Sequence, residues 1–211
     1  MDTKLLIFDF DGTLADSHKG NFETINYTLG RVGCKKISRS LFETLAGMPL
    51  EKQFETTLPK GKKGVVEKAC RIYREQYLKT CVKKTVLFPQ VKETLQFLKF
   101  KGVKMAVVTT KRTALVSMLL KALDISNFFD FVVGSDMVSE AKPSPEGINL
   151  AIKKLNANRE FTAIVGDSKF DMLAGKNAGI KTIAVNKAQE NRDLEADITA
   201  KDFRELEKIF H

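Results

Sequence analysis

The sequence contains no hydrophobic run of the roughly 18 residues that a membrane-spanning helix needs. Residues 1–4 lead into a short apolar segment ending at Asp9, which has neither the apolar stretch nor the cleavage site of a signal peptide. The three cysteines, Cys34, Cys70 and Cys81, form no CxxC pair, and their odd number argues against a disulfide framework. These absences favour a cytoplasmic protein with reduced thiols and no membrane partner.

The sequence also has no internal repeat and no low-complexity tract. Its 211 residues are 43% hydrophobic and 29% charged, values typical of a soluble globular protein. The net charge of +9 invites a nucleic-acid-binding function, but residues 16–84 hold 15 lysines and arginines against 7 acidic residues and so carry +8 of it. Because no nucleic-acid-binding motif accompanies this basic segment, we expect no nucleic-acid partner.

The hydrophobic pattern changes twice along the chain. Residues 4–10 form an apolar, β-rich run typical of a strand buried on both faces, whereas residues 17–81 show helical periodicity. After Pro89 helices and strands alternate: helices are expected at 90–100, 111–123, 145–155 and 171–178, and strands at 104–109, 129–134, 161–165 and 182–185. The pattern predicts an α/β fold, with a doubly wound, Rossmann-like parallel-sheet core at residues 1–15 and 85–211 and an all-α insertion at residues 16–84.

Polar residues concentrate where the predicted strands end. In an open parallel sheet, ligands bind beyond the carboxyl ends of the strands, so these side chains are expected to share one crevice. They are Asp9 and Asp11 after the first strand, Thr109 and Thr110 after the second, Lys142 after the third, and Asp167 and Asp171 after the fourth.

These residue types suit phosphoryl transfer. Carboxylates can hold a hard cation such as Mg²⁺, and lysine and threonine can bind the remaining phosphate oxygens. Asp9 is then a candidate covalent nucleophile, and Asp11, two residues later, a candidate proton donor to the leaving oxygen. The hydroxyls of Thr110 and Ser168 follow strands and can equally be helix N-caps.

Four motifs in order resemble those of the haloacid dehalogenase-like hydrolase superfamily. The segment Asp9–Ser17 (DFDGTLADS) resembles motif I, Thr109 motif II, Lys142 in KPSP motif III, and residues 166–171 (GDSKFD) motif IV. The resemblance spans nearly the whole chain. Within the superfamily, the position of the all-α insertion resembles the helical cap of the phosphoglycolate phosphatase and β-phosphoglucomutase branch.

The resemblance implies a role for each motif residue. Asp9 would be the nucleophile and a ligand of a Mg²⁺ cofactor, and Asp11 the general acid and base, with its backbone carbonyl also on the metal. Asp167 would be a further metal ligand, and Asp171 would orient water or Lys142 from outside the metal's ligands. In the phosphate clamp, Thr109 and Lys142 would bind the transferred group, with Thr110 as a further candidate. The partner would be a small anionic phosphorylated metabolite. The resemblance to this branch favours phosphoglycolate as the substrate, and inorganic pyrophosphate, sugar phosphates and nucleotides are the next candidates.

Other functions fit the sequence less well. Mutases that resemble β-phosphoglucomutase carry a histidine twelve residues after the nucleophile and an arginine in the cap's substrate loop, but this chain has Asn21 there and no arginine in residues 47–51. A dehalogenase lacks the second aspartate that Asp11 supplies, and a phospho-receiver domain lacks the insertion and is much shorter. The sequence leaves the substrate and the oligomeric state open.

Overall fold

The computed structural model describes residues 3–59, 63–185 and 194–210, and the chain divides into two units. The first unit comprises Met1–Asp16 and Leu87–His211, and the second comprises Ser17–Val86. The second unit is therefore an insertion that follows the first strand of the first unit closely in sequence.

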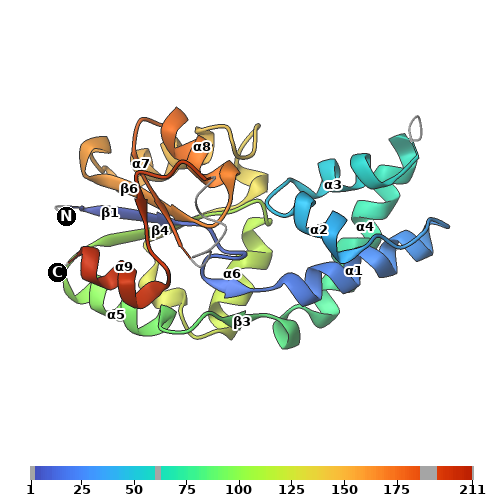
Figure 1. The fold of residues 1–211 in the computed structure, drawn as a ribbon, viewed down its shortest axis with the longest axis horizontal. Helices are drawn as coiled ribbons and strands as arrows, with labels where there is room; N and C mark the ends of the chain where they lie inside the picture. The colour runs from blue at the N-terminus through green and yellow to red at the C-terminus, as the bar shows by residue number, and fades with distance from the viewer. Residues whose placement is uncertain (1–2, 60–62, 186–193, 211) are drawn as a thin grey trace. The chain divides into compact units, whose positions relative to one another are not determined.

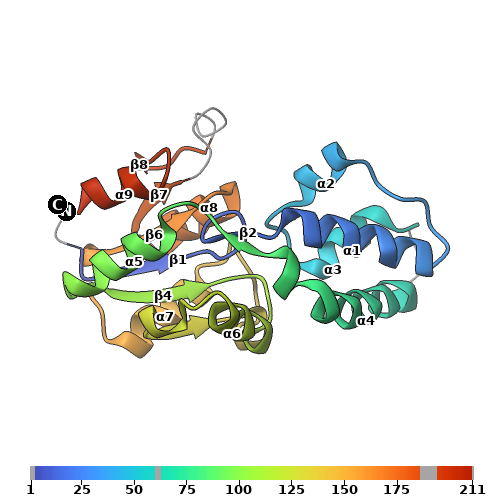
Figure 2. The same cartoon turned by 90° about the horizontal axis from the view of Figure 1, so that it is seen from below.

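A parallel sheet of six strands forms the centre of the first unit (Figure 1, Figure 2). Its strands are β1 (Leu5–Phe8), β4 (Lys104–Val108), β5 (Phe131–Val133), β6 (Thr162–Gly166), β7 (Lys181–Ala184) and β8 (Ile198–Thr199), in the spatial order β5-β4-β1-β6-β7-β8. In this order Phe8 lies beside Val107 on one side and Val165 on the other. The carboxyl ends of β4, β1 and β6 therefore meet at one edge of the sheet.

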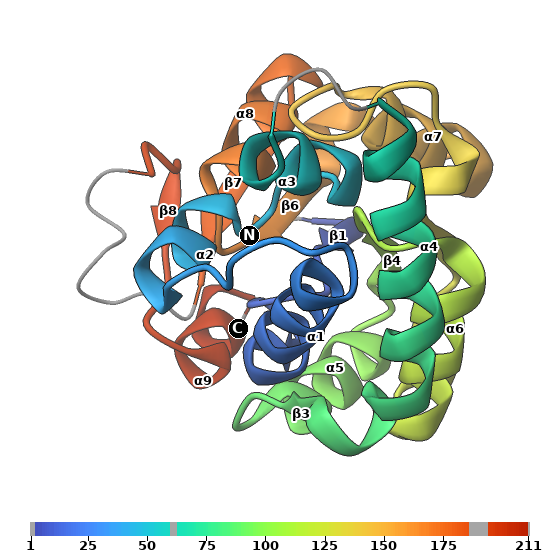
Figure 3. The same cartoon turned by 90° about the vertical axis from the view of Figure 1, so that its right-hand side faces the viewer.

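Both faces of β1 are buried, which explains its unbroken apolar sequence. Leu5 and Ile7 point to one face and join a core cluster with α7 (Glu146–Leu155) and α8 (Lys169–Asn177). Phe8 points to the other face, where its ring stacks on Phe203 of α9 (Phe203–Ile209) at 6.3 Å between centroids. In Figure 3, α7 and α8 accordingly lie on one side of the sheet, and α5 (Val91–Phe100) and α9 on the other. The remaining long helix of this unit is α6 (Thr113–Ala122).

The last two elements of the first unit, β8 and α9, were not among the expected elements. Asp202 begins α9 as its N-cap, because its side chain accepts a hydrogen bond from the Glu205 N–H at 2.8 Å. The α9 helix is tied to α5, since the Thr94 hydroxyl donates to the Phe203 carbonyl at 3.0 Å. These hydrogen bonds hold α9 in place, and Phe203 of α9 covers Phe8.

The second unit consists of α1 (His18–Arg31), α2 (Arg39–Leu45), α3 (Leu50–Thr57) and α4 (Lys63–Thr80). Aromatic side chains fill its core: the Tyr73 ring stacks on Tyr77 at 5.5 Å and meets Phe54 edge-on at 6.1 Å. The loop after α1 is held by Asn26, whose amide accepts from the Ile37 N–H at 2.8 Å and donates to the Ile37 carbonyl at 3.3 Å. This pairing fixes the loop between α1 and α2.

Short elements connect the longer ones. They are β2 (Ala15–Asp16), which pairs with β3 (Val86–Leu87), and the 3-10 turns Val82–Lys84, Ser126–Phe128, Ser135–Met137 and Arg159–Phe161. The architecture confirms the predicted fold class of a doubly wound α/β core with an inserted all-α part. Among the described residues, no helix combines the length and hydrophobicity that crossing a membrane requires.

Candidate active site

Asp9 and Asp167 lie at the carboxyl ends of adjacent strands. The Asp9 N–H extends the pairing of β1 with β6 by donating to the Val165 carbonyl at 3.0 Å, and Asp167 follows Gly166, the last residue of β6. From β1 the chain proceeds to β4 and β5 on one side of the sheet, and from β6 to β7 and β8 on the other. In open parallel sheets, ligands bind where the strand order reverses in this way, and both aspartates lie at that point.

A tight turn after Asp9 brings the backbone against Asp167. The N–H groups of Leu14 and Ala15 both donate to the Phe10 carbonyl at 3.0 Å, and Gly12 has a left-handed φ of +78°. A Cβ added at Gly12 would lie only 2.3 Å from Asp167 Oδ2, so the turn requires glycine for both reasons. The hydroxyl of Thr13 then donates to Asp167 Oδ1 at 2.9 Å, which fixes this carboxylate.

Lys142 reaches the same point from the loop after β5. Its ammonium lies 2.8 Å from Asp9 Oδ1 and 2.5 Å from Asp171 Oδ1, and it donates to the Val108 carbonyl at 3.1 Å. The Lys142 side chain is only 5% exposed, and such a charge is stable inside a protein when anionic partners surround it. The loop carrying Lys142 is held in turn by Asn177, whose amide donates to the Pro143 carbonyl at 2.9 Å.

Asp171 belongs to a capping box at the start of α8. Its Oδ2 accepts from the Ser168 N–H at 3.1 Å and from the Ser168 hydroxyl at 2.6 Å, and the Asp171 N–H donates back to that hydroxyl. Ser168 is therefore the helix N-cap, one of the two roles that its position allowed. Both carboxylate oxygens of Asp171 are thus engaged, one by Ser168 and the other by Lys142.

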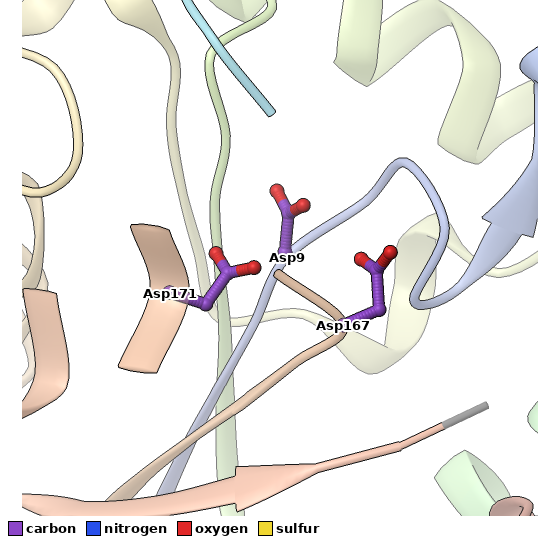
Figure 4. Close-up of side chains that lie close together, drawn as sticks. All are labelled: Asp9, Asp167 and Asp171. Atoms are coloured by element: carbon purple, nitrogen blue, oxygen red, sulfur yellow. The ribbon is translucent and has the colours of Figure 1, made fainter. Parts of the chain in front are cut away.

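Asp9, Asp167 and Asp171 form a cluster of buried carboxylates (Figure 4). One carboxylate oxygen from each lies within 4.8 Å of the others. Figure 4 shows the three side chains converging from the ends of β1 and β6 and from α8. The donor set consists of carboxylate oxygens, which are ligands that hard divalent cations prefer.

The electrostatics of the cluster favour an added positive charge. Burial raises the pKa of the Asp9 carboxyl to about 8; Lys142 acts against this shift, and the carboxylates of Asp171, Asp167 and Asp11 add to it. Burial alone would lower the pKa of the Lys142 ammonium, but Asp171 and Asp9 outweigh this effect and hold that pKa above its ordinary value. The buried acids thus outnumber the buried lysine among them, and a cation at the cluster would stabilise ionised Asp9.

The remaining predicted site residues lie at the same edge of the sheet. Thr109 is buried after β4, with its N–H donating to the Val133 carbonyl at 3.0 Å and its hydroxyl accepting from the Lys111 N–H at 3.3 Å. Thr110 is half-buried and is not the cap of α6, which begins after Arg112. Asp11 forms an ion pair with Lys111, at 2.9 Å between Oδ1 and Nζ.

Two residues in this arrangement were not among the predicted site residues. Thr13 orients Asp167, and Lys111 pairs with Asp11. A signal for Thr13 was present, because a hydroxyl in the tight turn after one acidic strand end has the carboxylate at the neighbouring strand end within reach. Lys111 offered only its place after Thr109 and Thr110, since the sequence does not indicate where a long side chain will point.

The chain is similar to known proteins along most of its length. Residues 6–185 match the family model described as haloacid dehalogenase-like hydrolase. The chain is 35% identical over 179 residues to a phosphoglycolate phosphatase from Aquifex aeolicus (strain VF5), covering 85% of this chain and 83% of that protein. It is also 35% identical over 185 residues to pyrophosphatase PpaX from Anoxybacillus flavithermus, covering 88% of this chain and 84% of that protein.

Solved structures show the same architecture. A haloacid dehalogenase-like hydrolase from Bacteroides fragilis superposes with a TM-score of 0.91 at 28% identity, covering 97% of this chain and 99% of that one. The haloacid dehalogenase-like family protein SP0104 from Streptococcus pneumoniae superposes with a TM-score of 0.88 at 30% identity, covering 100% of this chain and 99% of the other. Both matches cover residues of the α/β unit and residues of the helical unit.

Proposed function

This chain belongs to the haloacid dehalogenase-like hydrolase family, as its motifs predicted, and we propose that it is a Mg²⁺-dependent phosphatase acting through an aspartyl-phosphate on Asp9. It is a phosphoric monoester hydrolase, in keeping with relatives that are named phosphatases. The observation that carries the proposed mechanism is the placement of Asp9, which lies 2.8 Å from Lys142 and clusters with Asp167 and Asp171.

In the proposed reaction an Asp9 carboxylate oxygen attacks phosphorus, and the bond from phosphorus to the leaving oxygen breaks. Asp11 gives its proton to that oxygen. Water then attacks the aspartyl-phosphate, Asp11 takes a proton from the water, and the bond from Asp9 to phosphorus breaks to release phosphate. Lys142 offsets the negative charge of the transferred group, and Asp171 keeps the lysine aimed at it.

The donor set fits a magnesium ion. Asp9, Asp167 and the backbone carbonyl of Asp11 would hold it, because both oxygens of Asp171 already accept hydrogen bonds from Lys142 and Ser168. When bound, the ion supplies positive charge that lets an anionic phosphate approach a carboxylate. Burial is the largest cause of the raised pKa of Asp9, and the neighbouring carboxylates add to it; these crowded acids support the assignment because they favour binding of a cation.

Hydrolysis is favoured over phosphomutase chemistry by the surroundings of Asn21. The side-chain oxygen of Asn21 accepts from the Tyr73 hydroxyl at 3.0 Å, and its side-chain NH₂ donates to the Ser17 hydroxyl at 3.0 Å. A side-chain amide in this position cannot exchange protons as the histidine of β-phosphoglucomutase-like enzymes would. We therefore propose that water is the final acceptor of the phosphoryl group.

The substrate is proposed to be a small phosphorylated metabolite resembling phosphoglycolate. Inorganic pyrophosphate is the second candidate, because relatives of equal identity carry the two names. We further propose that residues 1–15 and 85–211 act as the catalytic core and that residues 16–84 act as the cap that selects the substrate.

A phosphate-release screen tests these proposals. Purified protein is assayed with Mg²⁺ on phosphoglycolate, pyrophosphate, sugar phosphates and nucleotides, and again with excess chelator. Asp9→Asn should abolish turnover and Asp167→Ala should raise the Mg²⁺ concentration needed, while Asp124→Asn, at a side chain that is 83% exposed, serves as the matched control. Substantial turnover in correctly folded Asp9→Asn protein would refute the nucleophile, and full activity in chelator would remove the metal.

A further inference from the structure

The pairing of Lys111 with Asp11 is a feature of the site that the proposed mechanism leaves unused. Lys111 Nζ lies 2.9 Å from Asp11 Oδ1, and the Lys111 side chain is 10% exposed. Ordering a lysine side chain this completely costs conformational entropy, and lysines are seldom so buried without a partner. We propose that Lys111 is a positioning residue that fixes the direction of the Asp11 carboxyl for proton transfer, an inference that rests on the proposed phosphatase function.

The backbone of Lys111 is a rigid anchor for this contact. Its N–H donates to the Thr109 hydroxyl at 3.3 Å, and its carbonyl accepts from the Ser135 N–H at 2.8 Å. Gly134 permits this close approach, because a Cβ there would lie 2.7 Å from the Lys111 carbonyl oxygen. The backbone of Lys111 is therefore held from two strand ends.

Asp11 needs such a partner more than Asp9 does. The Asp11 side chain is 24% exposed, whereas that of Asp9 is 9% exposed and packed beside Lys142. A partly exposed carboxyl can adopt several rotamers, and proton transfer requires an approach to within hydrogen-bonding distance of the leaving oxygen and later of water. The two lysines thus serve different carboxylates: Lys142 the nucleophile and Lys111 the acid and base.

The proton balance leaves Lys111 unchanged. Asp11 loses its proton to the leaving oxygen in the first step and regains one from water in the second, while Lys111 keeps its own proton throughout. The ammonium attracts the Asp11 carboxylate formed between these steps and holds it near the phosphorylated Asp9. Loss of Lys111 should therefore matter most for substrates whose leaving group requires a proton.

A comparison of leaving groups tests this inference. The kcat/KM value, which covers events up to the first phosphoryl transfer, is measured on the best alkyl phosphate of the screen and on dinitrophenyl phosphate, whose leaving group needs no proton. We expect Lys111→Met to lower kcat/KM at least about tenfold on the alkyl phosphate and less than about threefold on the aryl phosphate, as for partial loss of general acid catalysis. Lys111→Arg should recover part of the loss, and Lys121→Met, at an exposed lysine in the last turn of α6, should match the wild type.

A double-mutant cycle separates action through Asp11 from other roles. If Lys111 acts through Asp11, Lys111→Met should add almost nothing in an Asp11→Asn background, because the group that it positions has lost its acidity. Equal losses on both substrates, additive effects in the cycle, or a rise in KM confined to substrates with a second anionic group would overturn the inference. If the wild type is inactive on every substrate, both the phosphatase function and the role of Lys111 are refuted. If the wild type is active, Asp9→Asn is inactive and the cycle is additive, only the role of Lys111 is refuted.

Discussion

Replacement of Gly12 by alanine should impair catalysis more than it impairs stability. Gly12 has a φ of +78°, and an added Cβ would lie 2.3 Å from Oδ2, 2.6 Å from Cγ and 2.8 Å from Oδ1 of Asp167. Because carbon and its non-bonded neighbours normally stay about 3.5 Å apart, the carboxylate or the turn must move by about 1 Å. The Asp167 side chain can rotate away from the added Cβ. We therefore expect the substitution to displace the Asp167 carboxylate while the chain still folds.

Gly102 provides a matched control for the backbone cost. It has nearly the same φ of +76°, at the turn between α5 and β4, and an added Cβ there would meet no atom within 4 Å. Gly102→Ala should therefore cost only the left-handed backbone penalty of about 1 kcal/mol. Gly12→Ala should cost that amount plus about 1–3 kcal/mol for the forced contact and the disturbed hydrogen bond from Thr13.

The measurements are urea unfolding and phosphate release as a function of Mg²⁺ concentration. We expect Gly12→Ala to lower kcat about 100-fold, the effect of misplacing a group by about 1 Å, and to raise the Mg²⁺ concentration for half-maximal activity. Gly102→Ala should change neither quantity at a temperature where both variants are folded. The reasoning fails if the two variants lose equal stability and Gly12→Ala keeps wild-type activity.

Three further predictions follow from other contacts and charges. Burial raises the pKa of Asp130, but hydrogen bonds from Lys99 and the Met105 N–H outweigh it, so the pKa lies below its ordinary value. The stability lost in Asp130→Asn should therefore be greatest at neutral pH and vanish as the pH falls through the folded-state pKa. A constant difference in unfolding free energy from pH 7 to pH 3 would contradict this. The Glu146 carboxylate accepts from the N–H groups of Ser139 and Glu140, near the loop that carries Lys142. Glu146→Ala should therefore lower both Tm and kcat, and Glu146→Gln should lower them less. An unchanged kcat would show that this contact does not affect the site. If the basic residues of 16–84 attract anionic substrates, kcat/KM should fall with ionic strength while kcat stays nearly constant, and a flat profile at fixed free Mg²⁺ would assign these charges to ordinary surface.

The core of the fold was predictable because its strands are buried on both faces. The strand from Leu5 to Phe8 is uniformly apolar, and such runs are seldom anything but a central parallel strand when helices and strands alternate after them. The pair of β8 and α9 escaped prediction because β8 spans only Ile198–Thr199 and makes no periodic pattern. The sequence did indicate the start of α9, because Asp202 is followed three residues later by Glu205, a pattern typical of a helix N-terminus. In the structure Asp202 is the N-cap of α9.

The candidate site was predictable where strand ends alone determine position. Asp9 and Asp167 lie together because β1 and β6 are neighbours, and a parallel sheet brings the ends of neighbouring strands to one edge. The contact between Lys111 and Asp11 was not predictable in this way, since it depends on side-chain rotamers. The roles of all these residues stay predictions until variants are assayed.

The two substrates suggested by the relatives differ in how much they need Asp11. From phosphoglycolate the leaving group is the alkoxide of glycolate, which must be protonated as the bond to phosphorus breaks, whereas from pyrophosphate the leaving group is phosphate, a far weaker base. Asp9, Lys142 and the metal would act on the transferred phosphoryl group, which is alike in both, so these residues cannot discriminate between the substrates. The ion pair that holds Asp11 at 2.9 Å from Lys111 is of most use to an enzyme whose leaving group needs the proton. On the role proposed for Lys111, this contact would support a phosphate ester rather than pyrophosphate as the substrate.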